Sequence, residues 1–578
     1  MDPKTKKDMR QMSKILRIAA LFAMGVMAVG CNGLKDEPVV APEGPDGGKT
    51  VTVTATVGLD TPTKALTAAG VKTFAAGETI AVFYTNESLA LVKATYTFTD
   101  GDLIDGGRRA RITVSMTEAK AGGAVKYIYP AAMANDDGSV KYSALAEQDG
   151  TLAGLAANLD LATFDGTLTG EAALPASATL LNPLAIGEFT LKNWSGTGIT
   201  ADITNLVIAI DGVDTYTVAR AAADGPVYVA MQPVADTETL TFTATDGSTT
   251  YTRTITGKTL ESNNMYPVNL KMNRRINLDT VTTTDGNSVK YLAAQDGDII
   301  TNGNDEYYIT IPDGATVTLD GVSFTAPDEC DHAAIHCLGS AHIILNGNND
   351  IYAGHQSNYP AILAAHNTDG EEYTLTISGT GSLSADSIHS NYSAGIGGGY
   401  RIPCGNIAIE GGTIEATGGE YAAGIGSGNQ SSCGNITISG GQVRATGGEY
   451  AAGIGSGRQG SCSDITISGG SIGIYNSAFD TWDEGAIGGQ NAAGIGCGSY
   501  GSCGKITITD GIDFLYAEKG SEACIIGKGS GSSTCGTVTI SGVGMEYDQL
   551  RNGVHDGKIG ELYSNSNGYY WILSKAEL

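Results

Sequence analysis

The sequence is poor in aromatic residues and in basic residues. Phe, Trp and Tyr make up 7% of its 578 residues, and 34 Lys and Arg stand against 62 Asp and Glu, for a net charge of −28. Nucleic-acid binding needs concentrated Lys and Arg, so this charge excludes nucleic acid as a partner. The 81 glycines and the 41% of hydrophobic residues suit many short strands joined by tight turns.

The usual motifs of catalysis and of zinc binding are missing as well. The sequence has no G-x-S-x-G, P-loop or dinucleotide-binding fingerprint in a strand–turn–helix context, no HExxH and no CxxC pair. The seven histidines are scattered, and the only Asp-Asp pair, Asp136-Asp137, falls in the N-terminal half. We therefore expect no enzyme and no metal site among the cysteines.

The one long hydrophobic run lies near the N-terminus. Basic residues precede it, Ile18–Gly30 is too short to span a bilayer, and small residues lead to Cys31. This layout predicts a signal peptide over residues 1–30 and resembles a bacterial lipoprotein signal, which implies lipidation at Cys31. A standard signal peptidase site with Cys31 as a bystander is the alternative. We expect a lipid-anchored protein of the outer membrane, exposed at the cell surface, with a flexible tether over residues 31–49.

From Thr50 to about residue 276, short runs alternate between apolar and polar residues. Examples are TVTVTATVGL, ETIAVFYTN and ETLTFTATDG, which Gly, Asp and Asn separate. This period of two, broken by turn residues, indicates antiparallel β-sandwiches. The length and a quiet segment near 150–170 predict two of them, over residues 50–160 and 161–276.

This half resembles the fimbrillin-like family of Bacteroidetes surface lipoproteins. The resemblance rests on TPTKAL followed by FAAGETIAVFYTN, on KYIYPA, and on the closing run from GPVYVAMQPVADTETLTFTATDG to MYPVNLKM. It implies two tandem transthyretin-like sandwiches and pilus subunits as partners. Such subunits are usually cleaved after an Arg near the mature N-terminus, whereas no Arg occurs between Cys31 and Arg108. The chain therefore suits a retained anchor or a terminal subunit better than a pilus shaft.

The C-terminal half contains an internal repeat. Five cysteines precede strand-like runs such as NITISGG at steps of 29, 29, 41 and 32 residues: Cys404, Cys433, Cys462, Cys503 and Cys535. Repeats of this length must stack on one another to bury their apolar faces. We predict an all-β chain that continues as a single-stranded parallel β-helix over residues 277–545, with three short strands per coil, and a C-terminal cap over residues 546–578.

The cysteine column itself should be small apolar packing inside the coils. In-register cysteines on parallel strands have poor torsion geometry for a disulfide. Cys330 with Cys337, and Cys524 with Cys535, are the better candidates for disulfides.

Part of this half also resembles a family of β-helix carbohydrate-binding modules. The matching pieces are VTLDGVSF, AAIHC, AHIILNGNND and YTLTISGTGSLSA. The resemblance implies an acidic plant polysaccharide as ligand, bound with Ca²⁺, although no calcium site of that family maps onto particular residues.

A row of tyrosines is the first candidate binding site. Tyr392, Tyr421 and Tyr450 each precede the small-residue strand that opens a coil, as Tyr359 does earlier. Rings at coil spacing could stack on sugars, or they could simply stack on each other at a corner. The neighbouring Glu420 and Glu449 could bridge a Ca²⁺ ion or remain solvated.

The second candidate is a 12-residue insertion within residues 474–491. Insertions in solenoids project from one face, which is often the binding face. The glycan-binding candidates here are Tyr475, Phe479, Trp482 and Asp483. The alternative is an ordered loop that packs these aromatic residues onto the coil.

The leading hypothesis is a non-catalytic adhesin or glycan-binding protein that displays a β-helix on a fimbrillin-like stalk. Its partner would be a polysaccharide or a host glycan, with no cofactor other than Ca²⁺. The first alternative is a structural or terminal pilus-associated component with the β-helix as a spacer. The second is a polysaccharide-degrading enzyme, although strand-borne carboxylates are sparse in the regular coils.

Overall fold

The computed structural model describes residues 50–59, 73–158, 161–304, 306–328, 331–366, 371–476, 481–482, 485–541, 543–544, 561–565 and 568–574. The expected signal peptide, the tether and the lipidation site Cys31 lie outside these residues, as do Cys330, Phe479 and Asp483. No helix in the described part is long and apolar enough to cross a membrane. The chain forms two compact units, which are described separately.

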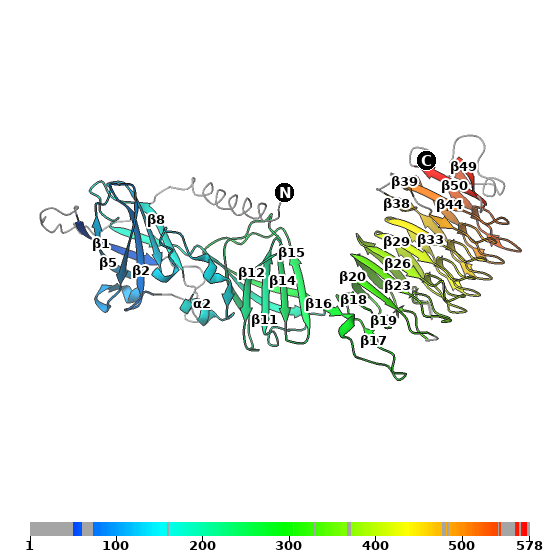
Figure 1. Cartoon of the computed structure of the whole chain (residues 1–578), viewed down its shortest axis with the longest axis horizontal. Coiled ribbons are helices and arrows are strands. Elements are labelled where there is room, and N and C mark those ends of the chain that lie inside the picture. The colour runs from blue at the N-terminus through cyan, green and yellow to red at the C-terminus, as the bar shows by residue number, and fades with distance from the viewer. Residues whose placement is uncertain are drawn as a thin grey trace. The chain divides into compact units, whose positions relative to one another are not determined.

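The first unit contains two four-stranded sheets (Figure 1). One has the order β4 (Leu103–Ile104), β5 (Arg109–Thr117), β1 (Thr50–Leu59), β9 (Ser177–Leu180). The other has the order β3 (Leu91–Thr97), β2 (Thr79–Thr85), β6 (Ala124–Tyr129), β8 (Ala162–Thr167). Alternate residues of β5 are buried, as the period of two predicts.

The strand pairing extends this unit beyond the expected limit at residue 160. Strand β8 pairs with β6, and β9 pairs in parallel with β1, so the unit ends at Asn182. Residues 142–159 belong to the second unit instead. There, β7 (Glu147–Gln148) pairs with β12 (Val213–Ala219), and the buried Gln148 amide bonds both the N–H and the C=O of Ala230. Short edge segments of this kind have no periodicity to reveal their partner.

The second unit begins with another sandwich. One sheet joins β13 (Val227–Met231), β10 (Ala185–Asn193) and β16 (Asn264–Asn277). The other joins β12 (Val213–Ala219), β11 (Asn205–Ile210), β14 (Leu240–Thr245) and β15 (Thr250–Ile255), and β15 reaches the end of β16. The helix α2 (Leu152–Asn158) completes this part.

Strand β16 is shared between the sandwich and the first coil of the β-helix. Its last three residues, Arg275 to Asn277, pair in parallel with β18 (Ile299–Asn302). The expected boundary at residue 276 therefore falls inside one continuous strand. The Arg274 guanidinium binds the Asp298 carboxylate through two hydrogen bonds of 2.9 and 2.6 Å.

The parallel β-helix is confirmed, with three main walls. The first wall contains β17 (Tyr291–Ala293), β19 (Tyr308–Ile311), β21 (Ile335–Cys337), β24 (Ile362–Leu363), β27 (Ile396–Gly397), β30 (Ile425–Gly426), β34 (Ile454–Gly455), β41 (Ile495–Gly496) and β45 (Ile526–Gly527). The second contains β18, β20 (Ala315–Thr325), β22 (Ala341–Asn346), β25 (Thr374–Gly379), β28 (Asn406–Ile409), β32 (Ile436–Ile438), β36 (Ile465–Ile467), β43 (Ile506–Ile508) and β47 (Val538–Ile540).

The third wall begins at the end of β20 and continues through β23 (Asn348–Tyr352), β26 (Ser382–Asp386), β29 (Thr413–Thr417), β33 (Gln442–Thr446), β37 (Ser471–Ile472), β40 (Ala486–Ile487) and β44 (Phe514–Glu518) (Figure 1). A fourth, short wall holds cysteines: β31 (Ser432–Cys433), β35 (Ser461–Cys462), β42 (Ser502–Cys503) and β46 (Thr534–Cys535). This fourth strand of the coil adds to the three that the repeat predicts.

Branched side chains fill the lumen in ladders. Ile425, Ile454 and Ile495 are directly in register on the first wall and have no exposed surface. Gly426 has a φ of +136°, and a Cβ there would collide with the carbonyl oxygen of Gly455 in the next coil. The repeated glycines thus allow the coils to approach each other closely at this wall.

A hairpin covers one edge of the last coils. Strand β50 (Gly568–Ser574) pairs antiparallel with β44 and with β49 (Glu561–Asn565), and so occupies an edge that would otherwise be open. None of the cysteines that the structure describes forms a disulfide. The expected disulfide between Cys524 and Cys535 is therefore wrong. Cys337 is a free thiol, and its expected partner Cys330 lies outside the described residues.

Candidate functional site: the aromatic corner

Aromatic side chains gather on the turn that joins the third wall to the first wall. This turn connects β23 to β24, β26 to β27, β29 to β30, and β33 to β34. We define the aromatic corner by its rings in these four coils: Tyr352, His355, His389, Tyr392, Tyr421 and Tyr450. Because the strands on both sides are in register, equivalent turn residues of successive coils lie above one another.

Buried serines shape the early turns of the corner. The Ser390 hydroxyl donates to the carbonyl of Ser357 at 2.6 Å, and the Ser387 hydroxyl donates to the carbonyl of Ala394 at 2.7 Å. The same Ser387 oxygen accepts the Ala361 N–H at 2.9 Å. These bonds tie each turn to its neighbour, so the exposed rings are held on a fixed backbone.

The three tyrosines form a stacked column. The ring centroids of Tyr392 and Tyr421 lie 5.3 Å apart at 17°, and those of Tyr421 and Tyr450 lie 5.2 Å apart at 8°. The guanidinium of Arg458 lies 5.4 Å from both the Tyr421 and the Tyr450 ring centroids. Of the two alternatives in the sequence, the structure shows mutual stacking. Both faces of Tyr421 are covered, and only ring edges and hydroxyls remain for a ligand.

The column is more open at the end formed by Tyr392. Tyr392 is 37% exposed, and the Tyr400 ring lies against it, tilted by 38° with the centroids 5.0 Å apart. Tyr359, the earlier member of the predicted row, is half-buried and packs against the lumen core. The exposed ring that a ligand meets first in this column is thus Tyr392.

The hydroxyls of Tyr421 and Tyr450 each interact with the carboxylate of the glutamate that precedes them in the sequence. The hydrogen bond to Glu420 raises the pKa of Tyr421 to about 12, and the bond to Glu449 raises the pKa of Tyr450. Both glutamates are exposed, one coil apart. Within the described residues, neither belongs to a group of three metal-ligating side chains. A bridging Ca²⁺ ion stays a prediction.

A recess that the sequence analysis missed lies at the early end of the corner. A cavity of about 170 Å³ is lined by Thr325, Tyr352, Ala353, His355, Asp386 and His389. The two imidazoles stack 4.4 Å apart at 11°, and the Tyr352 side chain is 38% exposed. Burial, together with the charges of Asp350 and Asp386, raises the pKa of Tyr352. An aromatic ring, two imidazoles and a carboxylate thus line one recess.

The recess was missed because these coils lie outside the regular 29-residue repeat. One signal was present in the sequence. His355 and His389 each stand three or four residues before a tyrosine of the predicted row, Tyr359 or Tyr392. The register confirms the alignment, since Tyr352 pairs with Asp386 and the Gln356 N–H bonds the carbonyl of His389 at 3.2 Å.

Little of the inserted segment lies within the described residues. Its ends form a two-stranded ladder of β38 (Tyr475–Asn476) and β39 (Thr481–Trp482), with Tyr475 opposite Trp482. Phe479 and Asp483 lie outside the described residues. A glycan-binding role for this segment stays a prediction.

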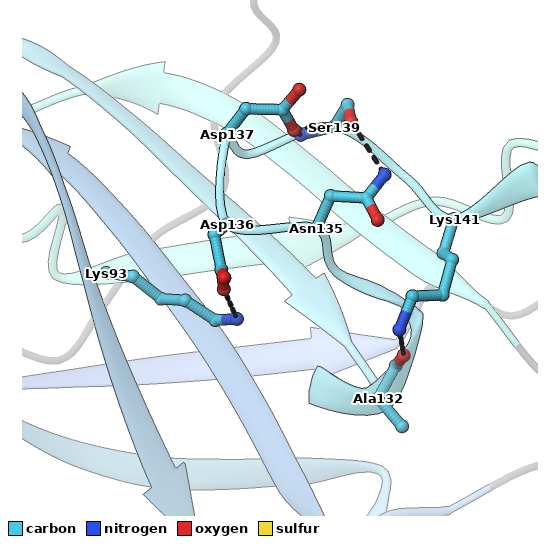
Figure 2. A network of polar contacts seen from close by, with 7 residues as sticks. All are labelled: Lys93, Ala132, Asn135, Asp136, Asp137, Ser139 and Lys141. Atoms are coloured by element: carbon cyan, nitrogen blue, oxygen red, sulfur yellow. Dashed lines mark hydrogen bonds and ion pairs between the residues drawn. The ribbon is translucent and has the colours of Figure 1, made fainter.

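The Asp-Asp pair of the first unit has local partners (Figure 2). The Lys93 ammonium lies 2.8 Å from the Asp136 carboxylate, and Asp137 accepts hydrogen bonds from the Ser139 hydroxyl and N–H at 2.5 and 2.9 Å. These bonds lower the pKa of both carboxyl groups. Two carboxylates that are both held ionised do not provide the protonated acid that glycoside hydrolysis needs.

Comparison with known proteins supports the β-helix. A family model described as "Beta helix repeat" matches residues 407–429 and 436–458. These segments run from the second wall round the third wall and the aromatic corner to the first wall and beyond. No curated protein matches the chain.

Among solved structures, the chain is similar to a fimbrial assembly protein from Parabacteroides distasonis, with 12% identity, a TM-score of 0.24, and coverage of 38% of this chain and 90% of that one. It is also similar to a Bacteroides ovatus protein named for cell adhesion (14%, TM-score 0.23, 40% and 96% covered). A third is a Bacteroides thetaiotaomicron protein named for polysaccharide binding (9%, TM-score 0.22, 38% and 91% covered). At TM-scores this low, the names of these proteins do not transfer to this chain.

Proposed function

We propose that this protein is a non-catalytic cell-surface protein that binds carbohydrate at the aromatic corner of its β-helix. The observation that carries the proposal is the recess beside Tyr352, where an exposed ring, two imidazoles and the Asp386 carboxylate converge. Ring faces suit the apolar side of a sugar, and carboxylate and imidazole groups suit its hydroxyls. The −28 charge of the chain favours a neutral glycan, or an acidic one bound together with cations.

The size of the recess limits what it holds. At about 170 Å³ it is smaller than the roughly 300–1,000 Å³ of typical ligand pockets. It therefore suits one sugar residue or a branch, while the rest of a glycan would run along the edges of Tyr392 and the tyrosine column. The covered faces of Tyr421 take no part in stacking on sugar.

The expected lipoprotein signal supports display at the cell surface. In this proposal, Cys31 is lipidated and holds the chain at the outer membrane. Replacement Cys31→Ala should release the protein from the membrane fraction and abolish incorporation of labelled fatty acid. Retention in the membrane fraction without label would contradict lipid anchoring.

A glycan array tests the binding proposal directly. The full chain is applied with Ca²⁺ and, separately, with a chelator, together with the variants Tyr352→Ala and His389→Ala. We expect a saccharide ligand whose binding falls at least about tenfold in both variants, because each removes one face of the recess. Tyr500→Ala is the matched control, since Tyr500 is 54% exposed on a different turn and should leave binding unchanged.

A purely structural role is the second candidate, and the stacked column is the observation that favours it. Tyr392, Tyr421 and Tyr450 stack on one another. Side chains whose only role is to stabilise the coils would be arranged in this way. In that case the array stays silent with a folded protein, and deletion of the β-helix displaces a protein partner. Release of reducing ends from a polysaccharide would instead contradict both proposals and indicate an enzyme.

A further inference from the structure

Three cysteines converge in the last coils of the β-helix. The Sγ atoms of Cys497 and Cys503 lie 2.9 Å apart, and those of Cys503 and Cys535 lie 3.0 Å apart. All three Sγ atoms are within 4.8 Å of one another. Over the residues that the structure describes, this three-cysteine cluster is the one group of three or more His, Cys, Asp or Glu side chains that could hold a metal ion.

The fold brings the three thiols together from two walls and two coils. Cys503 and Cys535 are in register on β42 and β46 of the short wall. Cys497 follows β41 of the first wall and meets Cys503 within the same coil. The separations of 6 and 32 residues hide this site from a search for CxxC pairs.

Cys497 departs from the repeat in its own coil. The preceding coils have AGIGSG, with Ser427 and Ser456, where this coil has AGIGCG. The hydroxyls of those serines are buried and accept the N–H groups of Gly457 and Gly498 at 3.0 and 3.1 Å. A serine at this place is therefore compatible with the coil, and the third thiol is an addition to the basic architecture.

The cluster is partly accessible. Cys497 and Cys503 are buried, whereas Cys535 is half-buried. The Cys497 thiol also lies 3.2 Å from the carbonyl oxygen of Thr534. A half-buried thiol at the open side, with two buried thiols behind it, forms a soft donor set.

We propose that the three-cysteine cluster binds one thiophilic d¹⁰ metal ion, of the class of Zn²⁺ and Cu⁺. Thiolates are the ligands that these ions prefer. In a zinc site with Zn–S bonds of about 2.3 Å, the sulfurs lie about 3.8 Å apart, so small side-chain rotations open the cluster enough. The fourth position of Zn²⁺ would fall to solvent or to the Thr534 carbonyl, whereas Cu⁺ needs only the three sulfurs.

A disulfide within the cluster is the competing outcome. It would join two of the three thiols and leave the third alone. The in-register pair Cys503 and Cys535 has the unfavourable torsion of parallel neighbours, so Cys497 with Cys503 is the pair to watch. One metal ion would be bound by all three sulfurs, whereas a disulfide would involve only two of them.

The test is a metal titration of the reduced full chain under anaerobic conditions. Cd²⁺ serves as the spectroscopic probe, through thiolate-to-metal charge-transfer absorption, and Zn²⁺ as the second ion. We expect one ion per chain and a Tm that rises with ion concentration. In Cys497→Ser the affinity should fall by more than the roughly 10–100-fold that loss of an outer-shell partner causes.

Cys433→Ala is the matched control, because it removes a thiol from the same cysteine column outside the cluster. It should keep the full stoichiometry and affinity. Circular dichroism establishes that Cys497→Ser is folded, as Ser427 and Ser456 predict. Three results overturn the proposal: no binding by the folded wild type, equal binding by Cys497→Ser, or a protein that carries a disulfide between Cys497 and Cys503 and, once reduced, binds no ion.

Discussion

The rings of Tyr421 and Tyr450 lie 5.2 Å apart and 8° from parallel, one coil above the other, and Arg458 lies over both. These side chains stack on the outer surface because the strands of successive coils are in register. The same corner continues to the stacked imidazoles of His355 and His389. One turn of the solenoid thus carries both a self-contained aromatic column and an open recess.

Removal of the central ring should weaken the β-helix. Tyr421 stacks on two neighbours, and aromatic pairs contribute about 0.5–1.5 kcal/mol each, so we expect Tyr421→Ala to lower the free energy of unfolding by about 1–3 kcal/mol. Urea denaturation measures it. Tyr421→Phe keeps the stack and should stay close to the wild type. If the two variants are equally stable, the column contributes nothing to the fold.

The Tyr421 hydroxyl should titrate late because of Glu420. Its pKa is raised to about 12, which means that the folded protein ionises this phenol after the unfolded chain does. The stabilising contribution is therefore complete below about pH 10 and is lost as the pH rises towards 12. Spectrophotometric titration of Glu420→Gln should show a pKa for this phenol that is nearer its ordinary value. The same titration with Tyr421→Phe added in the Glu420→Gln background identifies the Tyr421 signal by difference. An unchanged pKa would exclude the Glu420 interaction as the cause.

Two adjacent arginines should differ sharply in their effect on stability. Arg274 binds Asp298, whose side chain is 1% exposed and also accepts the Gln295 N–H at 2.7 Å. Loss of one partner of a buried pair costs about 3–5 kcal/mol, so Arg274→Ala should strongly destabilise the chain. Arg275 pairs with Asp320 at a more exposed position, and Arg275→Ala should cost about 0–1 kcal/mol. Equal losses in Tm for the two variants would contradict this reading of the shared strand β16.

The lumen ladder should be far less tolerant than the outer surface of the same coils. Ile454 is fully buried between Ile425 and Ile495, and Ile454→Ala should cost about 2–5 kcal/mol through the cavity that it leaves. Thr466, on the outer side of β36, is the control, and Thr466→Ala should change stability by less than about 0.5 kcal/mol. Similar losses in the free energy of unfolding for the two variants, measured by chemical denaturation, would contradict the view that packing in the lumen is the main source of β-helix stability.

Much of the fold followed from sequence alone, and for a physical reason. The steps of 29 residues and the Ile-x-Ile pattern determine which residues face the lumen, because strands alternate their side chains and stacked coils repeat their register. The parallel β-helix and the buried cysteine column were predicted on that basis. The alternation in the N-terminal half likewise predicted sandwiches, since it reports which face of each strand is buried.

Tertiary structure decided the contacts that no period encodes. The strands β8 and β9 close the first unit, and β16 continues into the β-helix. An edge strand pairs with the strand that the fold places beside it, and the sequence pattern does not encode this. The ring spacing of the tyrosine column depends on the pitch of the coils. The recess between Tyr352 and His389, and the meeting of Cys497 with Cys535, arise where residues of different coils and walls come together. Sequence determined which residues each coil offers, and only the stacking of the coils decided which of them meet.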